Sequence, residues 1–269
     1  MPPVCRLGLA TRGNTHLRPD DVVYAIDRGV NYLNWSGHPD GMSKAISGLG
    51  ETRSNVVVAC QFKARTADQA RRELEWILHE TGSDYLDIAT FYYVESEAEW
   101  QEIIGPGGSW EALAEYKHSG ALRMIGLTSH QRKLAANWID SRAKDADTYY
   151  LDMLMIRYNA AHRGAEREVF PAASARNAPV VTFTGLRWRE LLKPTPNDPP
   201  GFSPPSAAAC YRFCLANPAV AVALTAPGNR KHLEANLSLL DDWHAPPREK
   251  LEAIRQHGDR VHRHASEFW

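Results

Sequence analysis

The stretch NVVVACQFKARTADQARRELEWILHETGSDYLDIATFYY, residues 55–93, contains one complete strand–helix–strand unit. Its two ends are short apolar runs rich in β-branched residues, as expected of buried strands. The segment between them has Thr66 as the expected N-cap and Gln69 as its capping-box partner. Gly82 predicts the residue at which the helix stops.

The same alternation of strand and helix continues in both directions along the chain. Because most of the strand candidates are apolar on both faces, they favour a parallel sheet covered by helices. Eight such repeats in roughly 250 residues predict a closed (β/α)8 TIM barrel. The strands are expected at residues 5–11, 30–35, 55–62, 85–93, 122–129, 151–159, 179–185 and 219–226.

Helical patterns fill the intervals, and we expect residues 1–269 to form a single barrel domain. An open doubly wound sheet is the alternative, but GLATRGNT after the first strand lacks the glycine pattern G-x-G-x-x-G. The Pro-rich residues 192–206 are expected to form a long loop, and a final helix is expected at about 246–264. Barrel helices are expected at 19–29, 66–82, 109–120, 130–143, 165–177, 206–217 and 230–242.

The amino-acid composition limits the kinds of binding partner that we expect. The formal net charge is −1, without runs of like charge, which argues against a nucleic-acid partner. No apolar stretch approaches the roughly 20 residues that span a bilayer, and no secretion signal is evident at the start. Three of the four cysteines, Cys5, Cys60 and Cys214, lie in apolar runs and resemble core residues of a cytoplasmic protein. The pair in CYRFC lacks the second pair that a metal site needs. We therefore expect a small-molecule substrate and no metal.

Polar residues gather where the predicted strands end, which in a barrel is the catalytic face. The second strand runs into NYLNWSGHPDG, residues 31–41. Asp40 and Glu95 are the acids near strand ends, and they belong to different loops. This supply is poor for a metal-dependent hydrolase or a glycosidase. The remaining hydroxyls, amides, phenols and imidazoles predict a site that orients a polar organic molecule and moves a proton.

The segment APGNRKHLEAN, residues 226–236, predicts a phosphate site after the last strand. Its helix is expected to begin at about Gly228 or Asn229, and backbone N–H groups at a helix start favour phosphate. Cations are disfavoured there by the helix dipole, so a bound phosphate would compensate for Arg230, Lys231 and His232. The alternative is that Arg230 and Lys231 simply point into solvent.

Several segments match, in order, the motifs of one family. They are GVNYLN (29–34), GSDYLDIATFYY (82–93), LRMIGLTSH (122–130), LMIRYNAAHRGAEREVFPAA (154–173) and LANPAVAVALTAPGNRKHLEANL (215–237). Through them the sequence resembles the aldo-keto reductase family, whose members are (β/α)8 barrels that bind a nicotinamide cofactor across the C-terminal face. The resemblance covers nearly the whole chain.

The family's catalytic Asp, Tyr, Lys and His are all replaced. The Asp, Lys and His positions hold Asn34, Gln61 and Tyr92, and the Tyr position, in a loop shorter by one residue, holds His38 or Pro39. Two neutral amides cannot tune a proton donor as a Lys–Asp pair does. The resemblance therefore implies an oxidoreductase for a small polar carbonyl-type substrate with a remodelled donor, taken from Tyr92, Tyr93, His38 or Lys63. A non-redox isomerase or lyase and a non-catalytic nucleotide- or ligand-binding relative remain alternatives.

The resemblance carries over better to the cofactor side of the site. It implies that strand five holds the carboxamide and that Phe183 stacks on the nicotinamide ring. The basic first turn after strand eight favours a 2′-phosphate, and hence NADP. The implied cofactor-binding residues are Thr11, Thr128, Ser129, Phe183, Thr184, Gly185, Leu186, Gly228, Asn229, His232 and Asn236.

Overall fold

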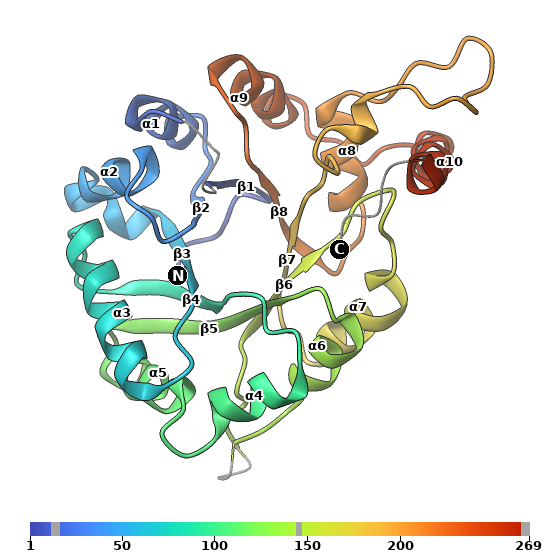
Figure 1. Ribbon diagram of the computed structural model, residues 1–269. Helices are drawn as coiled ribbons and strands as arrows, with labels where there is room; N and C mark the ends of the chain where they lie inside the picture. Colours follow the sequence, from blue (N-terminus) through green and yellow to red (C-terminus); the bar gives the residue numbers. More distant parts are fainter. Residues whose placement is uncertain (12–16, 144–146, 265–269) are drawn as a thin grey trace.

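The computed structural model describes residues 1–11, 17–143 and 147–264 and confirms the predicted closed barrel. All eight strands are parallel and pair in sequence order, and β1 closes the ring against β8 (Figure 1). The closure excludes the open doubly wound sheet. The strands are β1 (Leu7–Ala10), β2 (Tyr32–Trp35), β3 (Val57–Phe62), β4 (Leu86–Phe91), β5 (Leu122–Ser129), β6 (Met153–Arg157), β7 (Val180–Phe183) and β8 (Val220–Thr225).

Helices surround the strands as an outer ring (Figure 1). The α-helices are α1 (Pro19–Asp27), α2 (Gly41–Ser47), α3 (Ala67–Thr81), α4 (Glu97–Ile104), α5 (Ser109–Ser119), α6 (Arg132–Trp138), α7 (Ala165–Ala175), α8 (Ala207–Leu215), α9 (Arg230–Leu237) and α10 (Arg248–His264). Three 3-10 helices, η1 (Gly50–Asn55), η2 (Glu190–Leu192) and η3 (Ser238–Leu240), complete the elements. Of these helices, α2 and α4 were not anticipated from the sequence.

Side-chain alternation divides each strand between two environments. One set fills the inside of the barrel and includes Ala59, Ile88, Met155, Val181 and Phe183. The other set faces the helices, as Trp35 does, which stacks on Trp76 of α3 with ring centroids 5.5 Å apart. This parity decides which residues at the strand ends point into the barrel mouth.

A buried ion cluster joins η1 to β3, β4 and β5. The Asp87 carboxylate is fully buried and lies 2.9 Å from the Arg53 guanidinium and 2.7 Å from that of Arg123. It also accepts the Val58 N–H at 2.9 Å. A buried carboxylate is tolerated because these donors compensate for its lost hydration.

Long-range contacts fasten the Pro-rich segment between η2 and α8 to α10. The Asp198 carboxylate lies 2.7 Å from Arg260 Nε and 3.5 Å from His257 Nδ1. Burial opposes its ionisation, but the Thr195 N–H and hydroxyl, Arg260 and His257 together lower the pKa of Asp198 to about 2.

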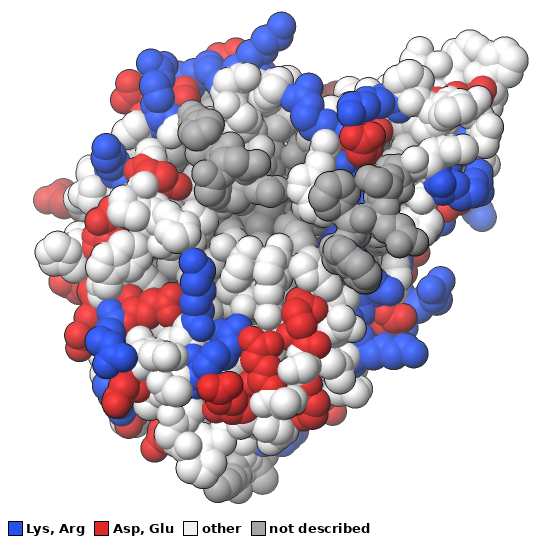
Figure 2. All heavy atoms as spheres, viewed as in Figure 1, with Lys and Arg blue, Asp and Glu red and all other residues white. Residues whose placement is uncertain are grey.

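The outer surface carries mixed charge. Figure 2 shows acidic and basic side chains interspersed over the face in view. Among the described residues, no helix combines the length and the apolar character that crossing a membrane requires.

Candidate active site at the barrel mouth

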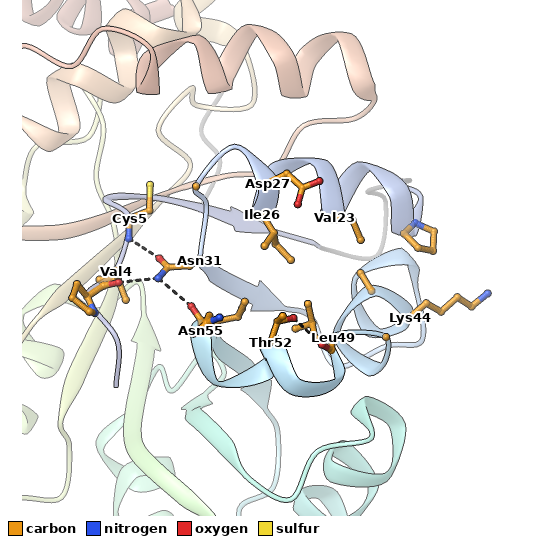
Figure 3. A pocket seen from close by; sticks show the side chains of 16 residues that line it. Val4, Cys5, Val23, Ile26, Asp27, Asn31, Lys44, Leu49, Thr52 and Asn55 are labelled. Atoms are coloured by element: carbon orange, nitrogen blue, oxygen red, sulfur yellow. Dashed lines mark hydrogen bonds between the residues drawn. The ribbon is translucent and has the colours of Figure 1, made fainter.

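A groove between α1, α2 and the N-terminal segment lies away from the strand ends that carry function in barrels (Figure 3). Its lining includes Cys5, Asn31 and Val56, which precede β1, β2 and β3. The Asn31 side-chain amide accepts the Cys5 N–H at 2.7 Å and donates to the Pro3 carbonyl at 2.8 Å. These contacts fix the chain start to the barrel, so this face serves stability.

Two of the expected catalytic residues lie on adjacent strands. Asn34 and Gln61 are each one residue before the end of β2 and β3, and both continue the inward-facing series of their strand. Asn34 is 1% exposed, and its Oδ1 has no hydrogen-bond partner among the residues described. A buried polar atom without a partner is costly, and such atoms often mark a ligand site.

His38 lies at the rim rather than inside the mouth. It is exposed, and its carbonyl accepts the Trp35 indole N–H at 2.8 Å. Its Nε2 lies 3.3 Å from Lys63 Nζ, so two of the expected donor candidates meet each other. The Lys63 N–H is held by the Glu73 carboxylate of α3 at 2.9 Å.

Tyr92 follows β4 and lies beside Tyr93. Their rings stack with centroids 4.0 Å apart, and the Tyr92 carbonyl accepts a hydrogen bond from Arg65 at 2.7 Å. Tyr93 adopts a φ of 49°, a left-handed conformation that is unusual for a bulky residue. The chain thereby turns sharply on leaving β4.

The turn brings Glu95 onto His130, a pair that the sequence did not reveal. The Glu95 carboxylate accepts the His130 backbone N–H at 2.9 Å and lies 3.0 Å from its Nδ1. Burial opposes ionisation of Glu95, but the His130 side chain and backbone lower its pKa overall. The imidazole lies 4.6 Å from the Tyr93 ring and 6.0 Å from that of Phe183.

The other acid expected near a strand end has a structural role. Asp40 caps α2, and its carboxylate accepts the N–H groups of Met42 at 2.8 Å and Ser43 at 3.0 Å. The mouth therefore has one carboxylate–imidazole pair among the residues described. The signal that could have found it is position, because Glu95 and His130 follow the adjacent strands β4 and β5.

Two of the cofactor residues expected on β5 and β7, Thr128 and Phe183, face the barrel interior and are buried. No described residue pairs with the Thr128 hydroxyl. The Ser129 hydroxyl instead accepts the Gln131 N–H at 2.9 Å. The Thr184 backbone has a φ of 54°, and its carbonyl accepts the Asn159 amide at 2.8 Å.

Three further cofactor candidates have packing roles. A Cβ on Gly185 would lie 3.0 Å from the Tyr211 ring of α8, so only glycine fits there without displacement. Leu186 packs partly buried against the core. Thr11, at the end of β1, is buried with its hydroxyl 3.9 Å from Met42 Sδ.

The helix after β8 begins as expected, but its cations are arranged differently. Asn229 caps α9 by accepting the His232 N–H at 3.0 Å. Arg230 lies 3.2 Å from Asp21 and stacks on the Tyr24 ring, with its side chain partly exposed. A different cation, Arg189 from the loop after β7, lies at this helix start, with its Nη1 2.9 Å from His232 Nε2.

The two remaining cofactor candidates after β8, Gly228 and Asn236, differ in how enclosed they are. Gly228 is open, because a Cβ added there would have His232 alone, of the described residues, within 4 Å. Asn236 is enclosed, and its amide donates to the Thr225 hydroxyl at 2.8 Å. Burial, Arg189 and Lys231 lower the pKa of His232, which shows that positive charge is concentrated at this helix start.

The thiol pair on α8 is not arranged as a metal site. Cys210 and Cys214 are buried, and burial raises the pKa of Cys210 to about 12, which disfavours the thiolate a metal would need. Within the described ranges, no three His, Cys, Asp or Glu side chains are grouped so that they could hold a metal ion.

The family model described as the aldo/keto reductase family matches residues 14–192. The aldo-keto reductase AKR11C1 from Bacillus halodurans, in its holo form, superposes with a TM-score of 0.73 at 17% identity, over 96% of this chain and 92% of that one. Its apo form gives a TM-score of 0.71 over the same shares, also at 17% identity. The comparison with curated proteins found no match.

Proposed function

Because the chain belongs to the aldo/keto reductase family, we propose that it is an NADP-dependent oxidoreductase that acts on a small polar carbonyl-type substrate with a remodelled proton donor. Bound NADPH supplies a hydride in such a reaction. The protein's own residues must then orient the carbonyl group, exclude water and deliver a proton to its oxygen.

The nicotinamide half of the mouth fits this cofactor. The buried Thr128 hydroxyl, on β5, can form a hydrogen bond with a carboxamide. Phe183, on β7 and so on the other side of β6, can provide an aromatic face. Asn34 and Gln61 supply neutral amides across the barrel, and Tyr92 supplies a phenol, which suits the orientation of a polar substrate.

The cations that could bind the cofactor's 2′-phosphate differ in part from those expected from the sequence. Arg189 and Lys231 lie beside the His232 ring at the start of α9, whereas Arg230 is held by Asp21. Mutual repulsion among these cations would be relieved by a 2′-phosphate, which favours NADP over NAD.

The observation that carries the proposed chemistry is the Glu95–His130 pair beside Phe183. An ionised carboxylate can only accept, so His130 Nδ1 carries a proton toward it and Nε2 is the nitrogen left for the substrate. In its doubly protonated form, His130 would donate its Nε2 proton to the carbonyl oxygen as the carbon is reduced, would keep its Nδ1–H on Glu95, and would regain the Nε2 proton from solvent. His38, beside Lys63, remains a proposed participant at the rim.

Cofactor binding tests the proposal without knowledge of the substrate. Titration of the full chain with NADPH, followed by nicotinamide fluorescence, should show saturable binding. Phe183→Ala should weaken it about two- to tenfold because an aromatic contact is lost. Phe202→Ala is the matched control, since Phe202 lies in the Pro-rich segment against His257. Absence of binding at millimolar NADPH would contradict the proposal.

A non-redox isomerase or lyase is the second candidate, because a carboxylate-held imidazole moves protons without a cofactor. It predicts turnover that depends on His130 and persists when nicotinamide is omitted. A cofactor requirement in the same assay would exclude it.

A further inference from the structure

Left-handed backbone is concentrated at the barrel mouth. Among the described residues other than glycine, six have a positive φ, and all but Asn177 follow β4 or β7. Tyr93 lies two residues past the end of β4 and has a φ of 49°. This conformation is unfavourable for a bulky side chain, and where the surroundings impose it, it points to a functional role.

The chain is anchored on both sides of Tyr93. Tyr92 donates its N–H to the last carbonyl of β3 at 2.8 Å, and Val94 donates its own to a carbonyl of β5 at 3.1 Å. The Val94 side chain is fully buried. Glu95 donates its N–H to the Glu99 carboxylate at 3.0 Å. Because both flanks are fixed, residue 93 takes the left-handed conformation whatever its side chain.

The ring of Tyr93 lies against the His130 imidazole. The two ring centroids are 4.6 Å apart, with 41° between the ring planes. Tyr92 supports the Tyr93 ring, since their centroids are 4.0 Å apart with 29° between the planes. Phe183 approaches the same imidazole edge-on, at 6.0 Å and 83°. The imidazole thus has aromatic neighbours from the loop after β4 and from β7.

A second contact with His130 comes from the same turn. The Glu95 carboxylate lies 3.0 Å from Nδ1 and accepts the His130 N–H at 2.9 Å. A hydrogen bond at one nitrogen leaves an imidazole free to tilt about the axis of that bond. A ring packed against the imidazole opposes this tilt, so Glu95 and Tyr93 together fix the direction of Nε2.

The side chain at residue 93 is not the one that its backbone favours. Glycine and asparagine adopt the left-handed conformation at lower cost than tyrosine does. Burial offers little compensation, since Tyr93 is 38% exposed. What tyrosine provides at this position, and asparagine does not, is an aromatic ring in contact with His130.

We propose that Tyr93 is a positioning residue, whose ring holds the His130 imidazole in the orientation needed to donate a proton to the substrate. This inference rests on the proposed function, in which His130 is the donor. It gives Tyr93 a different role from that of the proton donor considered from the sequence. Because the ring carries the role, phenylalanine should be able to replace tyrosine, and asparagine should not.

NMR of the full chain labelled with nitrogen-15 histidine measures the contact without turnover. Tyr93→Asn should shift the His130 ring signals, because they lose the ring current of the neighbouring side chain. Tyr93→Phe should leave these signals close to their wild-type positions, and His130→Gln identifies them by their absence. Trp243→Asn is the matched control, since it removes an exposed ring that lies over Arg6, away from the mouth.

Steady-state kinetics with NADPH and 4-formylbenzoate, a small polar aldehyde, measures the consequence. Tyr93→Asn should lower kcat about ten- to hundredfold while KM changes by less than about twofold, because only the orientation of the donor is lost. Tyr93→Phe should keep kcat within about twofold of the wild type. The Tm of Tyr93→Asn should stay within about 4 °C of the wild type, since relief of backbone strain offsets the lost ring contacts.

Each contrary result has a separate meaning. Unchanged His130 signals in Tyr93→Asn would overturn the inference, whether or not the chain reduces aldehydes. A wild-type kcat in Tyr93→Asn, when His130→Gln lowers kcat, would also overturn it. Equal losses of kcat in Tyr93→Phe and Tyr93→Asn would make the phenol the acting group and contradict the inference. Shifted His130 signals in a chain that reduces no aldehyde would support the positioning of the imidazole and contradict the proposed function.

Discussion

At the scale of single residues, the carboxylate-held imidazole is the group on which the proposed chemistry depends. His130→Gln should lower kcat for 4-formylbenzoate reduction by about 10²- to 10⁴-fold, the usual contribution of a positioned general acid. NADPH affinity should be unchanged, because the variant keeps a polar side chain of similar size. The exposed His118→Gln on α5 is the matched control.

Glu95 is expected to act through His130 as a positioning residue. Glu95→Gln keeps an acceptor for Nδ1 but removes the charge, so kcat should fall while KM changes little. A kcat in Glu95→Gln equal to that of the wild type would show that the charge of Glu95 does not act through His130.

His162 should make the protein sensitive to acid. Burial, and then repulsion from Arg157 and Arg187, lowers its pKa in the folded state to about 3, below the value of about 6.5 in an unfolded chain. Between these values the unfolded state binds more protons, so this group's contribution to stability falls as pH drops from about 6.5 toward 3. His162→Gln should therefore lose less Tm than the wild type between pH 7.5 and pH 5 in thermal melts. Parallel losses in the two proteins would contradict this assignment.

At the scale of elements, the Asp87 cluster couples three strands to η1. Asp87→Ala should lower the free energy of unfolding by about 3–5 kcal/mol, because it leaves two buried or half-buried guanidiniums without their carboxylate. Urea unfolding measures this loss. Asp68→Ala, whose side chain is 83% exposed, should change stability by less than about 0.5 kcal/mol. Similar losses in both variants would rule out a special role for the cluster.

Elements with strong local signals were predictable from the sequence. Thr66 and Gln69 form the expected capping box, and Gly82 ends α3 with a φ of 58°. In contrast, α2 and α4 have only 7 and 8 residues, too few for a clear apolar period. Their caps, Asp40 and Ser96, are the signals that could have located them.

The site was less predictable than the strands because its geometry depends on loops. The sequence located polar residues at the strand ends, including Asn34, Gln61 and Thr128. It held no sign that Tyr93 would take a left-handed turn, which brings Glu95 to His130. The contact between Arg187 and His162 likewise joins two separate loops.

At the scale of the whole molecule, the barrel mouth has two chemically different halves. The β2–β4 side presents the amides of Asn34 and Gln61 and the phenol of Tyr92, with His38 and Lys63 at its rim. The Glu95–His130 pair follows β4 and β5 and lies beside Phe183 of β7. This arrangement suits a polar carbonyl substrate that is oriented by neutral amides and protonated near Phe183.

The central claim is that a carbonyl carbon receives hydride in this mouth. A single-turnover reaction of the wild-type chain with NADPH dideuterated at C4 and with 4-formylbenzoate tests it directly, by mass spectrometry of the product. We expect 4-(hydroxymethyl)benzoate with one deuterium on the former carbonyl carbon and one equivalent of NADP⁺. Bound NADPH that stays unconsumed, or an alcohol without deuterium, would contradict the claim.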